Sequence, residues 1–341
     1  MRIKSIVRLI VIIVLSLAVV MAIWWFYPAR TLQIRSEDKT SLSLIDYIEI
    51  GGIEQCVLIR SKNRNNPILL FLHGGPGMPM MYLAHEFQRP LEENFTVVQW
   101  DRRGAGKTYS RNKPTVESMN VRQIVDDAYA LIDTLKTRYH QDKIILVGHS
   151  FGTYLGSIMV NERPELFKAY VSIGQVVDNE KSIAIQERFI REQAQKNKRE
   201  DILAALAKPE KPNFESWLFE FGGELKNSKS YFPFIWSGMQ APEYTLPEVL
   251  DVAEASSFSS FHMKYNVLKG SILDEIREYQ VPVYFFTGTF DYTTPYELVE
   301  AYFDLISAPE KEMVYFNNSA HFPFFEEPER FCKEINRIFA D

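Results

Sequence analysis

The sequence has few cysteines and no excess of positive charge, and both shortages exclude classes of protein. Its 341 residues include only Cys56 and Cys332, too few and too far apart for a disulfide framework or a zinc cluster, although whether they pair stays open. The formal net charge is −6, so the chain lacks the basic stripe of a nucleic-acid-binding protein. The sequence also has no internal repeats and no low-complexity tract. We therefore expect one globular protein without a nucleic-acid partner.

One long uncharged stretch lies near the N-terminus. Leu9 to Tyr27 carries no charge, follows Arg8 and ends in four aromatic residues that begin at Trp24. About 20 apolar residues cross a bilayer as a helix, and aromatic side chains favour its interfaces. A cleaved signal peptide is the alternative, but its apolar region is usually about 7–15 residues long. We predict an uncleaved single-pass anchor over residues 1–30 in the cell membrane, with the globular part outside the cytoplasm.

Beyond this stretch, short apolar runs alternate with helical patterns. Gly51 and Gly52 separate two strand-like runs, residues 47–50 and 56–60, and predict a hairpin. Apolar residues recur at helical spacing from Val121 to Tyr139. Further strands are expected at Ile68–Leu72, Thr96–Trp100, Lys143–Val147, Ala169–Ile173, Val281–Thr287 and Met313–Phe316, and helices at Phe151–Asn161 and about Pro328–Ala340. Fully apolar strands that alternate with helices indicate an α/β fold whose mostly parallel sheet carries helices on both faces.

The alternation stops between Gln175 and about Gly270. This segment is rich in charged and aromatic residues with helical patterns, and apolar strands resume only at Val281. We predict a helical cap inserted over the sheet, with a separate domain as the alternative. The domains are then residues 40–174 for the first part of the core, 175–272 for the cap and 273–341 for the second part of the core.

A serine between two glycines lies where a strand pattern becomes a helix pattern. The segment IILVGHSFGTYLG places Ser150 in the pattern G-x-S-x-G. Between a buried strand and a helix, this pattern predicts a sharp turn that exposes the serine hydroxyl above the sheet. The amides at the start of the helix stabilise negative charge there. A tight turn without chemistry is the alternative, but the context favours a nucleophile.

A nucleophilic serine needs a base, and the base needs an orienting acid. In this architecture the chain order is serine, acid, histidine. His321 lies in the loop FNNSAHFPFFEEP, after the last strand and before the last helix. Asp291 follows the preceding strand in VPVYFFTGTFDYTTP, where a turn or helix-cap role is the alternative. We predict the catalytic triad Ser150, Asp291 and His321.

Two glycine-containing loops remain to be assigned. The backbone N–H of Phe151 and that of Gly75, in FLHGGPG, are the expected oxyanion-hole donors. The segment GAGKT, Gly104 to Thr108, resembles a P-loop, but Asp101 occupies the position of its first glycine and no long helix is expected to follow. We interpret it as a structured loop in which Asp101 and the neighbouring arginines form local ion pairs.

Together these motifs resemble the prolyl aminopeptidase (proline iminopeptidase) family of α/β-hydrolase serine peptidases. The matches are HGGPG at His73–Gly77, DRRGAGKT at Asp101–Thr108, GHSFGT at Gly148–Thr153, the Asp291 loop and NNSAHFPFFEEP at Asn317–Pro328. The resemblance implies an α/β-hydrolase fold, an acyl-enzyme mechanism and no metal or organic cofactor. Two departures are Arg102, where the family usually has glutamine, and the elbow G-H-S-F-G in place of G-G-S-W-G.

The resemblance also implies acidic cap residues that bind a free substrate α-amino group. The candidates are Glu187, Glu192, Glu215, Glu220 and Glu224. We select Glu220 and Glu224, which lie near Trp217 and Phe221; the alternative is that they are solvated helix charges. The preferred function is a membrane-anchored serine hydrolase, an aminopeptidase acting on short peptides. The alternatives are an esterase, lactonase or amidase acting on a small acyl substrate, and a non-catalytic binding protein of the same fold.

Overall fold

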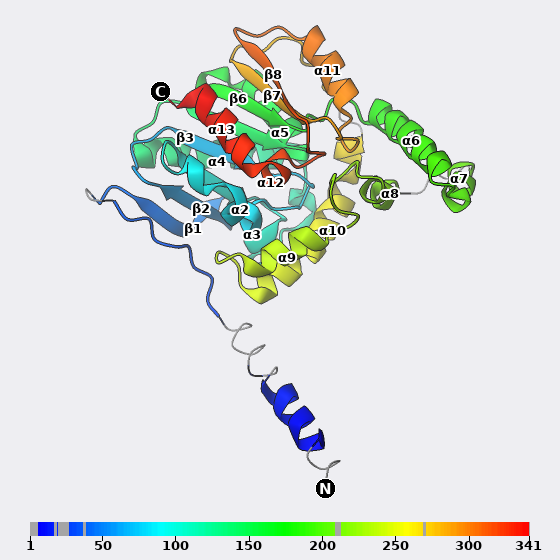
Figure 1. Cartoon of the computed structure of the whole chain (residues 1–341). Helices are drawn as coiled ribbons and strands as arrows, with labels where there is room; N and C mark the ends of the chain where they lie inside the picture. The colour runs from blue at the N-terminus through cyan, green and yellow to red at the C-terminus, as the bar shows by residue number, and fades with distance from the viewer. Residues whose placement is uncertain are drawn as a thin grey trace.

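An eight-stranded sheet forms the centre of the computed structural model, which describes residues 6–16, 19, 27–36, 39–208, 213–268 and 271–340 (Figure 1). The strands are β1 (Leu42–Ile50), β2 (Ile53–Ser61), β3 (Ile68–Leu72), β4 (Thr96–Asp101), β5 (Ile144–His149), β6 (Phe167–Ile173), β7 (Val283–Gly288) and β8 (Lys311–Phe316). Their spatial order is β1-β2-β4-β3-β5-β6-β7-β8. β1 with β2 and β2 with β4 pair antiparallel, and the other neighbours pair parallel. The predicted mostly parallel sheet is confirmed.

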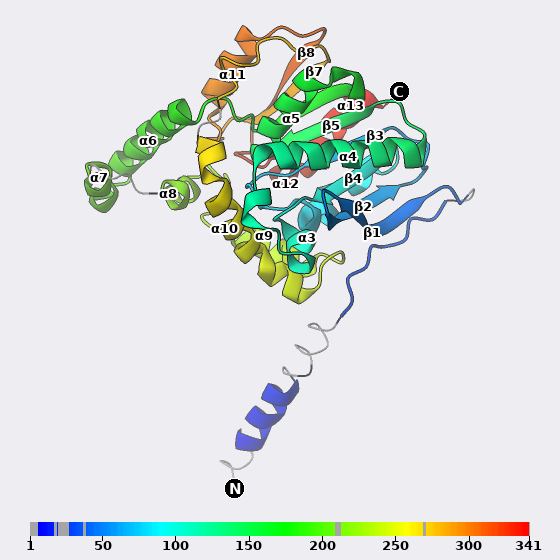
Figure 2. The same cartoon turned by 180° about the vertical axis from the view of Figure 1, so that it is seen from behind.

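Helices cover both faces of the sheet. One face carries α4 (Val121–Tyr139), α5 (Phe151–Glu162) and α11 (Tyr296–Leu305), which Figure 2 shows from behind. The other carries α2 (Ala84–Phe87), α12 (Pro323–Glu326) and α13 (Pro328–Phe339). Successive residues of β3 alternate between the two cores, with Leu70 in one and Phe71 in the other. This double burial explains why the central strands are continuous apolar runs.

Three local features bear on the sequence predictions. The predicted helix from Val121 to Tyr139 is α4, and its N-cap Asn120 accepts a hydrogen bond from the Gln123 amide. Cys56 and Cys332, whose pairing the sequence left open, are both buried and free. The P-loop-like segment leads into α3 (Gly106–Arg111), which has only six residues and is not the long helix of a P-loop.

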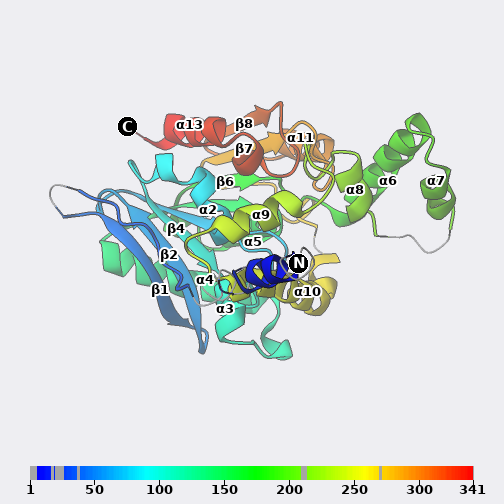
Figure 3. The same ribbon diagram turned by 60° about the horizontal axis from the view of Figure 1, so that its bottom comes forward.

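Among the described residues between β6 and β7 there are five helices, and we refer to this part of the chain as the cap. They are α6 (Asn179–Lys196), α7 (Glu200–Leu206), α8 (Glu215–Glu220), α9 (Phe232–Gln240) and α10 (Leu246–Leu268). Figure 3 shows α6, α7 and α8 extending to one side, while α9 and α10 lie against the rest of the molecule. The first three have their own small apolar cluster, which includes Ile190, Ile202 and Leu218. The cap therefore has an outer part and a part attached to the core.

Side-chain contacts join α10 to the loop after β4. Ser259 donates a hydrogen bond to the Gly104 carbonyl at 2.7 Å, and Lys107 forms an ion pair with Glu248 at 2.6 Å. Tyr109 donates to Glu254 at 2.8 Å. The segment that resembles a P-loop is thus occupied by contacts with the cap.

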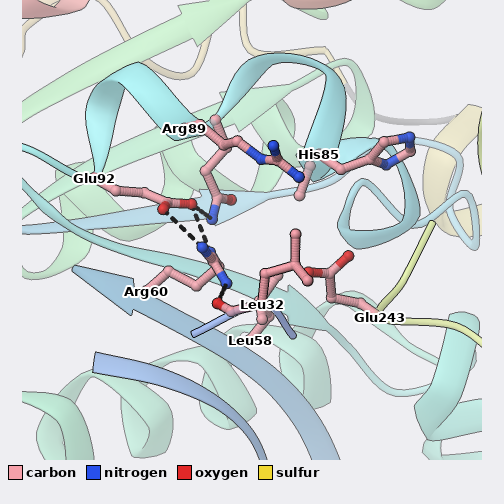
Figure 4. Close-up of a pocket in the computed structure, with 9 residues that line it drawn as sticks. Leu32, Leu58, Arg60, His85, Arg89, Glu92 and Glu243 are labelled. Atoms are coloured by element: carbon pink, nitrogen blue, oxygen red, sulfur yellow. Dashed lines mark hydrogen bonds and ion pairs between the residues drawn. The ribbon is translucent and has the colours of Figure 1, made fainter. Parts of the chain in front are cut away.

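A stem at residues 27–36 packs against the core beside the cap. The Arg30 amide donates to the Pro242 carbonyl at 2.8 Å, and the Thr31 hydroxyl donates to Glu243 at 3.0 Å. Arg60 of β2 donates to the Leu32 carbonyl at 2.6 Å and pairs with Glu92 at 2.7 Å, around the small pocket of Figure 4. The stem therefore links β2 to the connection between α9 and α10.

The N-terminal apolar segment is described only in part. Residues 6–16 are helical, whereas positions 1–5, 17, 18 and 20–26 of the predicted anchor lie outside the described residues. Within the described part of the chain, no helix is both long enough and apolar enough to cross a membrane. The anchor over residues 1–30 stays a prediction from the sequence.

Candidate active site

Ser150 occupies a sharp turn at the end of the central strand β5. Its backbone has φ 52° and ψ −123°, and α5 begins at the next residue. The left-handed φ is strained for a residue with a side chain, so the surrounding contacts have to hold it. The Ser150 amide donates to the Ile173 carbonyl at 2.9 Å, and the Thr153 hydroxyl donates to the Ser150 carbonyl at 2.6 Å. The predicted strand–turn–helix context of Ser150 is therefore present.

The two glycines that flank Ser150 are required by close packing. A Cβ at Gly152 would lie 2.1 Å from the Leu72 carbonyl oxygen, and one at Gly148 would lie 2.7 Å from the Gly152 carbonyl oxygen. The atoms that such a Cβ would meet belong to the backbone, which cannot move aside as a flexible side chain could. The G-x-S-x-G pattern therefore follows from two close approaches, that of the start of α5 to β3 at Gly152 and that of β5 to the start of α5 at Gly148.

Asp291 and His321 form a buried pair at the same edge of the sheet. Asp291 follows β7, and His321 lies in the loop between β8 and α12. The imidazole Nδ1 lies 2.8 Å from Asp291 Oδ2, with both side chains almost fully buried. Asp291 Oδ1 accepts the amides of Thr293 and Thr294, each at 2.9 Å, and the Thr294 hydroxyl donates to Oδ2 at 2.8 Å. The carboxylate is thereby fixed as a hydrogen-bond acceptor for the imidazole.

The electrostatics of His321 favour its charged form. Burial lowers the pKa of His321, but the carboxylates of Asp291, Glu224 and Glu326 raise it above the usual histidine value. The His321 amide also donates to the Glu224 carbonyl at 3.1 Å, which fixes the loop. An imidazole that gains a proton easily, and is held by a carboxylate at Nδ1, is suited to accept a proton at Nε2.

Ser150 and His321 face the same space. The carbonyl of Ile173 holds the Ser150 amide, and a Cβ at the next residue, Gly174, would lie 2.9 Å from His321 Cε1. The ring of His149, the residue before the serine, has its centroid 4.7 Å from the His321 ring centroid. Both Ser150 and His321 line one cavity of about 1430 Å³. Ser150 therefore lies on the same cavity as His321, which in turn pairs with Asp291.

The loop after β3 forms another part of this cavity wall. Gly75 has φ 106°, and a Cβ there would lie 2.3 Å from the Gly77 amide nitrogen, so only glycine fits. Gly74 and Gly75 line the cavity with Ser150. Phe151, the other residue of the predicted oxyanion hole, is the first residue of α5. Its N–H therefore belongs to the first turn, where amides have no partner within the helix.

The buried side chain of Arg102 is hydrogen-bonded to the backbone of the glycine loop. Its guanidinium donates to the carbonyls of His73, Gly74 and Pro76, and its Cζ lies 5.2 Å from the Phe151 ring centroid. The side chain is fully buried, and burial lowers the pKa of Arg102 to about 9, so it is still a cation at neutral pH. Sequence reasoning placed Arg102 in a local ion pair, but its hydrogen-bond partners are backbone carbonyls.

Arg103 and Asp101 also have other partners than the expected local ion pairs. Arg103 pairs with Asp127 of α4 at 2.9 Å. Asp101 accepts the Lys107 amide at 2.8 Å and the hydroxyl of Tyr244 from the cap. Burial raises the pKa of Asp101 to about 7. These partners are distant in the sequence or belong to the backbone, so they could not be predicted from neighbouring charges.

The two predicted amine-binding residues lie in different places. Glu224 is buried in the cavity wall, and Thr293 donates a hydrogen bond to its carboxylate. Burial raises the pKa of Glu224 to about 7. Glu220 does not line the cavity; its carboxylate pairs with Arg199. The prediction for Glu220 is corrected, because α8 ends at Glu220 and a turn redirects the chain before Glu224.

Sequence reasoning missed several residues at the site. Thr294 donates to Asp291, and His149 Nε2 lies 2.9 Å from the His321 carbonyl oxygen. Glu215, one of the wider set of cap candidates, lines the cavity and accepts a hydrogen bond from Tyr231. Among the described residues, no three His, Cys, Asp or Glu side chains are grouped so that they could hold a metal ion.

Two sequence comparisons with known proteins match most of the chain. The family model described as alpha/beta hydrolase fold matches residues 67–328. The probable aminopeptidase YbaC of Bacillus subtilis (strain 168) is 30% identical over 311 residues, which cover 88% of this chain and 97% of that protein.

Two solved structures resemble the chain along most of its length. A proline iminopeptidase-related protein from Thermus thermophilus has a TM-score of 0.64 at 20% identity, over 88% of this chain and 98% of that one. The proline iminopeptidase of Mycobacterium smegmatis has a TM-score of 0.65 at 18% identity, over 86% of this chain and 97% of that one. At such identities these two likenesses concern the fold alone.

Proposed function

This chain belongs to the α/β-hydrolase fold family, and on that premise we propose that it is a serine aminopeptidase of the prolyl aminopeptidase type. The observation that carries the proposal is the buried pair of His321 and Asp291, which shares one cavity with the strained turn at Ser150. The likeness to a probable aminopeptidase supports the choice of substrate class. Short peptides with a free N-terminus are the proposed substrates.

The reaction begins when Ser150 Oγ attacks the carbonyl carbon of the substrate and its proton passes to His321 Nε2. The tetrahedral intermediate collapses, the carbon–nitrogen bond breaks, and the same proton moves to the leaving amine. Water then attacks the acyl-enzyme, gives a proton to His321 and releases the acid, and the proton returns to Ser150. Throughout these steps Asp291 holds the imidazole through Nδ1, 2.8 Å away.

The backbone N–H groups of Gly75 and Phe151 are proposed to hold the oxyanion of the tetrahedral intermediate. Removal of one such donor typically lowers kcat about 10²–10³-fold. The loop that contains Gly75 is held by Arg102, whose guanidinium binds the carbonyls of His73, Gly74 and Pro76. The preorganised loop supports this role, because the donors need not reorient during the reaction.

Glu224 is the proposed partner of the substrate α-amino group. Its carboxylate lines the cavity with Ser150 and His321 and is buried, where an ion pair with an ammonium group is stronger than in water. Glu215 lines the same cavity and adds a second negative charge. Together they favour a cationic substrate.

A small ester, lactone or amide remains the alternative substrate for the same chemistry. The wall that α9 and α10 contribute to the cavity is largely apolar, and an acyl group without an amine would fit there. Under this alternative, the two glutamates would have no substrate charge to pair with. The free amine is therefore the feature that separates the two functions.

A panel of chromogenic substrates tests the proposal directly. Prolyl, alanyl and N-blocked aminoacyl nitroanilides and simple nitrophenyl esters are offered to the purified full-length protein in detergent. Cleavage of unblocked anilides, with blocked ones resistant, supports the aminopeptidase; cleavage of esters alone removes it. Ser150→Ala has to abolish turnover, with Ser110→Ala as the matched control away from the cavity. Undiminished turnover in Ser150→Ala would overturn any serine mechanism.

The proposal includes the N-terminal anchor, with the catalytic part outside the cytoplasm. The apolar side chains of the helix at residues 6–16 are exposed and pack against no part of the core, and a bilayer would cover them. Membrane fractionation of the full chain and of a variant without residues 1–30 tests this. Recovery of the full chain in the soluble fraction would contradict the anchor and leave the chemistry untouched.

A further inference from the structure

The cavity beside Ser150 is larger than an aminopeptidase for prolyl residues requires. It has a volume of about 1430 Å³, whereas pockets that hold drug-sized ligands usually have about 300–1,000 Å³. A prolyl group and a small leaving group would fill only a part of it. The rest of the space has to be explained by something else that binds there.

One wall of this space is formed by the cap and is apolar. We call it the α9–α10 wall; its members are Phe234, Ile235, Met239, Leu246, Val249, Leu250 and Val252. Met78 and Tyr82 face it from the loop region after β3. The unbranched methionines adapt to ligands of different shape. This wall is suited to an alkyl chain or an aromatic group.

The wall continues to the outside of the molecule. Ile235 and Leu250 line the cavity, yet they are 52% and 58% exposed. Phe232 and Trp236, also on α9, are 64% and 55% exposed, and their stacked rings add apolar surface to the same helix. A long apolar group can therefore lie along the wall and still be partly shielded where it leaves the cavity.

The charges at the cavity restrict the rest of the substrate. Glu215 and Glu224 supply the carboxylates, and no lysine or arginine occurs among the described residues that line the cavity. A free substrate carboxylate would be held there without a cationic partner, which is unfavourable in a partly buried site. The site thus favours a substrate with an amine and without a nearby free carboxylate.

We propose that the cavity takes substrates that combine a free amine near the scissile carbonyl with a large apolar group that lies along the α9–α10 wall. This substrate class deepens the proposed aminopeptidase function and rests on it. The apolar group belongs either to the acyl residue or to the leaving group. The expected gain is about fourfold in kcat/KM for each methylene that the wall buries.

Two series of amides test the inference on the full-length protein. One lengthens the acyl side chain from alanyl through norvalyl and norleucyl to aminooctanoyl nitroanilide. The other keeps the alanyl group and adds alkyl chains of increasing length to the anilide.

A rise of kcat/KM with length in either series supports the inference and identifies the side that binds the wall. A fall with length in both series, while alanyl and prolyl anilides are cleaved, overturns it and leaves the proposed function intact. Failure to cleave every compound overturns both.

A wall variant separates binding in the cavity from general hydrophobicity of the substrate. Val249→Trp places a large ring in the space along the α9–α10 wall. The ratio of kcat/KM for the longest compound to that for the alanyl anilide is therefore expected to fall at least about tenfold. Val116→Trp, on an exposed turn away from the cavity, is the matched control and has to keep the ratio. Circular dichroism verifies that both variants fold. An unchanged ratio in a folded Val249→Trp protein would show that the apolar group binds elsewhere.

Discussion

The core and the cap contribute to the same cavity, but they hold their residues in different ways. Asp291 and His321 lie in loops that begin directly at sheet strands, and backbone amides fix the carboxylate through hydrogen bonds. Glu224 lies in an irregular segment of the cap, and its carboxylate has a side-chain hydroxyl as partner. The core thus fixes the proposed catalytic groups tightly, whereas the proposed amine-binding carboxylate of the cap has fewer fixed partners.

The attachment of the cap agrees with this division. α10 is joined to the loop after β4 through side chains, such as Lys107 with Glu248, and Tyr244 just before α10 contacts Asp101. Sheet strands, by contrast, are joined by backbone ladders. Changes in the core should therefore abolish the reaction, and changes in the cap should alter substrate choice or stability.

The largest expected effect comes from the acid of the core. Asp291→Asn replaces an acceptor with an amide that can present a donor to His321 Nδ1, which favours the wrong tautomer. We expect kcat/KM to fall about 10⁴-fold at neutral pH with the fold preserved. Steady-state kinetics on the best anilide of the panel measure this, with the exposed Asp274→Asn as control. A loss of less than tenfold would remove Asp291 from the proposed mechanism.

Loss of the hydrogen bonds between Arg102 and the glycine loop should have the next largest effect on the rate. Arg102→Met keeps the length of the side chain but has no donor for the three carbonyls of residues 73, 74 and 76, so the Gly75 amide should lose its position. We expect kcat to fall about 10²-fold, the typical value for one displaced oxyanion donor, with a smaller change in KM. Arg330→Met on α13 is the surface control. A change in KM alone would show that the loop binds substrate without stabilising the oxyanion.

These core residues were predictable because sheet topology restricts where they can lie. β5, β7 and β8 run parallel through a continuous set of neighbours, so the residues after their carboxyl ends meet at one edge. Chain order then selected Ser150, Asp291 and His321 from the sequence. The same reasoning could not find the partners of Arg102, because its sequence position shows a charge but not the three carbonyls that it binds.

The cap was less predictable for a different physical reason. Glu220 and Glu224 are four residues apart, a spacing that puts two side chains on the same face only while a helix continues. α8 ends at Glu220, and Gly222 with φ 78° turns the chain, so one carboxylate lines the cavity and the other pairs with Arg199. Helix ends are the least certain feature of a sequence pattern, and here the functional assignment depended on one.

Replacement of the two glutamates tests the proposed role of the cap in substrate binding. Glu224→Gln removes the proposed partner of the amine, so KM for an unblocked anilide should rise about tenfold, and Glu220→Gln is the matched control that should leave KM unchanged. Because burial raises the pKa of Glu224 to about 7, the carboxyl gains a proton and loses its charge as pH falls through about 7. KM of the wild type should therefore rise below that pH.

The pH profile of the variant distinguishes this role from a structural one. The KM of Glu224→Gln should depend less on pH, because the group that titrates is gone. The fall of kcat/KM at low pH should remain, because protonation of His321, whose pKa is raised, still removes the proposed base. A wild-type KM that is independent of pH between about 5 and 8 would contradict amine binding by Glu224.

The smallest expected effect concerns the stem that joins the core to the cap connection. Thr31→Val removes the hydroxyl that donates to Glu243 and accepts a hydrogen bond from Arg60, while the size of the side chain is kept. Loss of these two buried hydrogen bonds should lower the free energy of unfolding by about 2 kcal/mol, at about 1 kcal/mol each. Urea denaturation measures this, with Thr134→Val on the exposed face of α4 as control. Equal stability of the two variants would mean that the hydrogen bonds of the Thr31 hydroxyl add nothing to the stability of the protein.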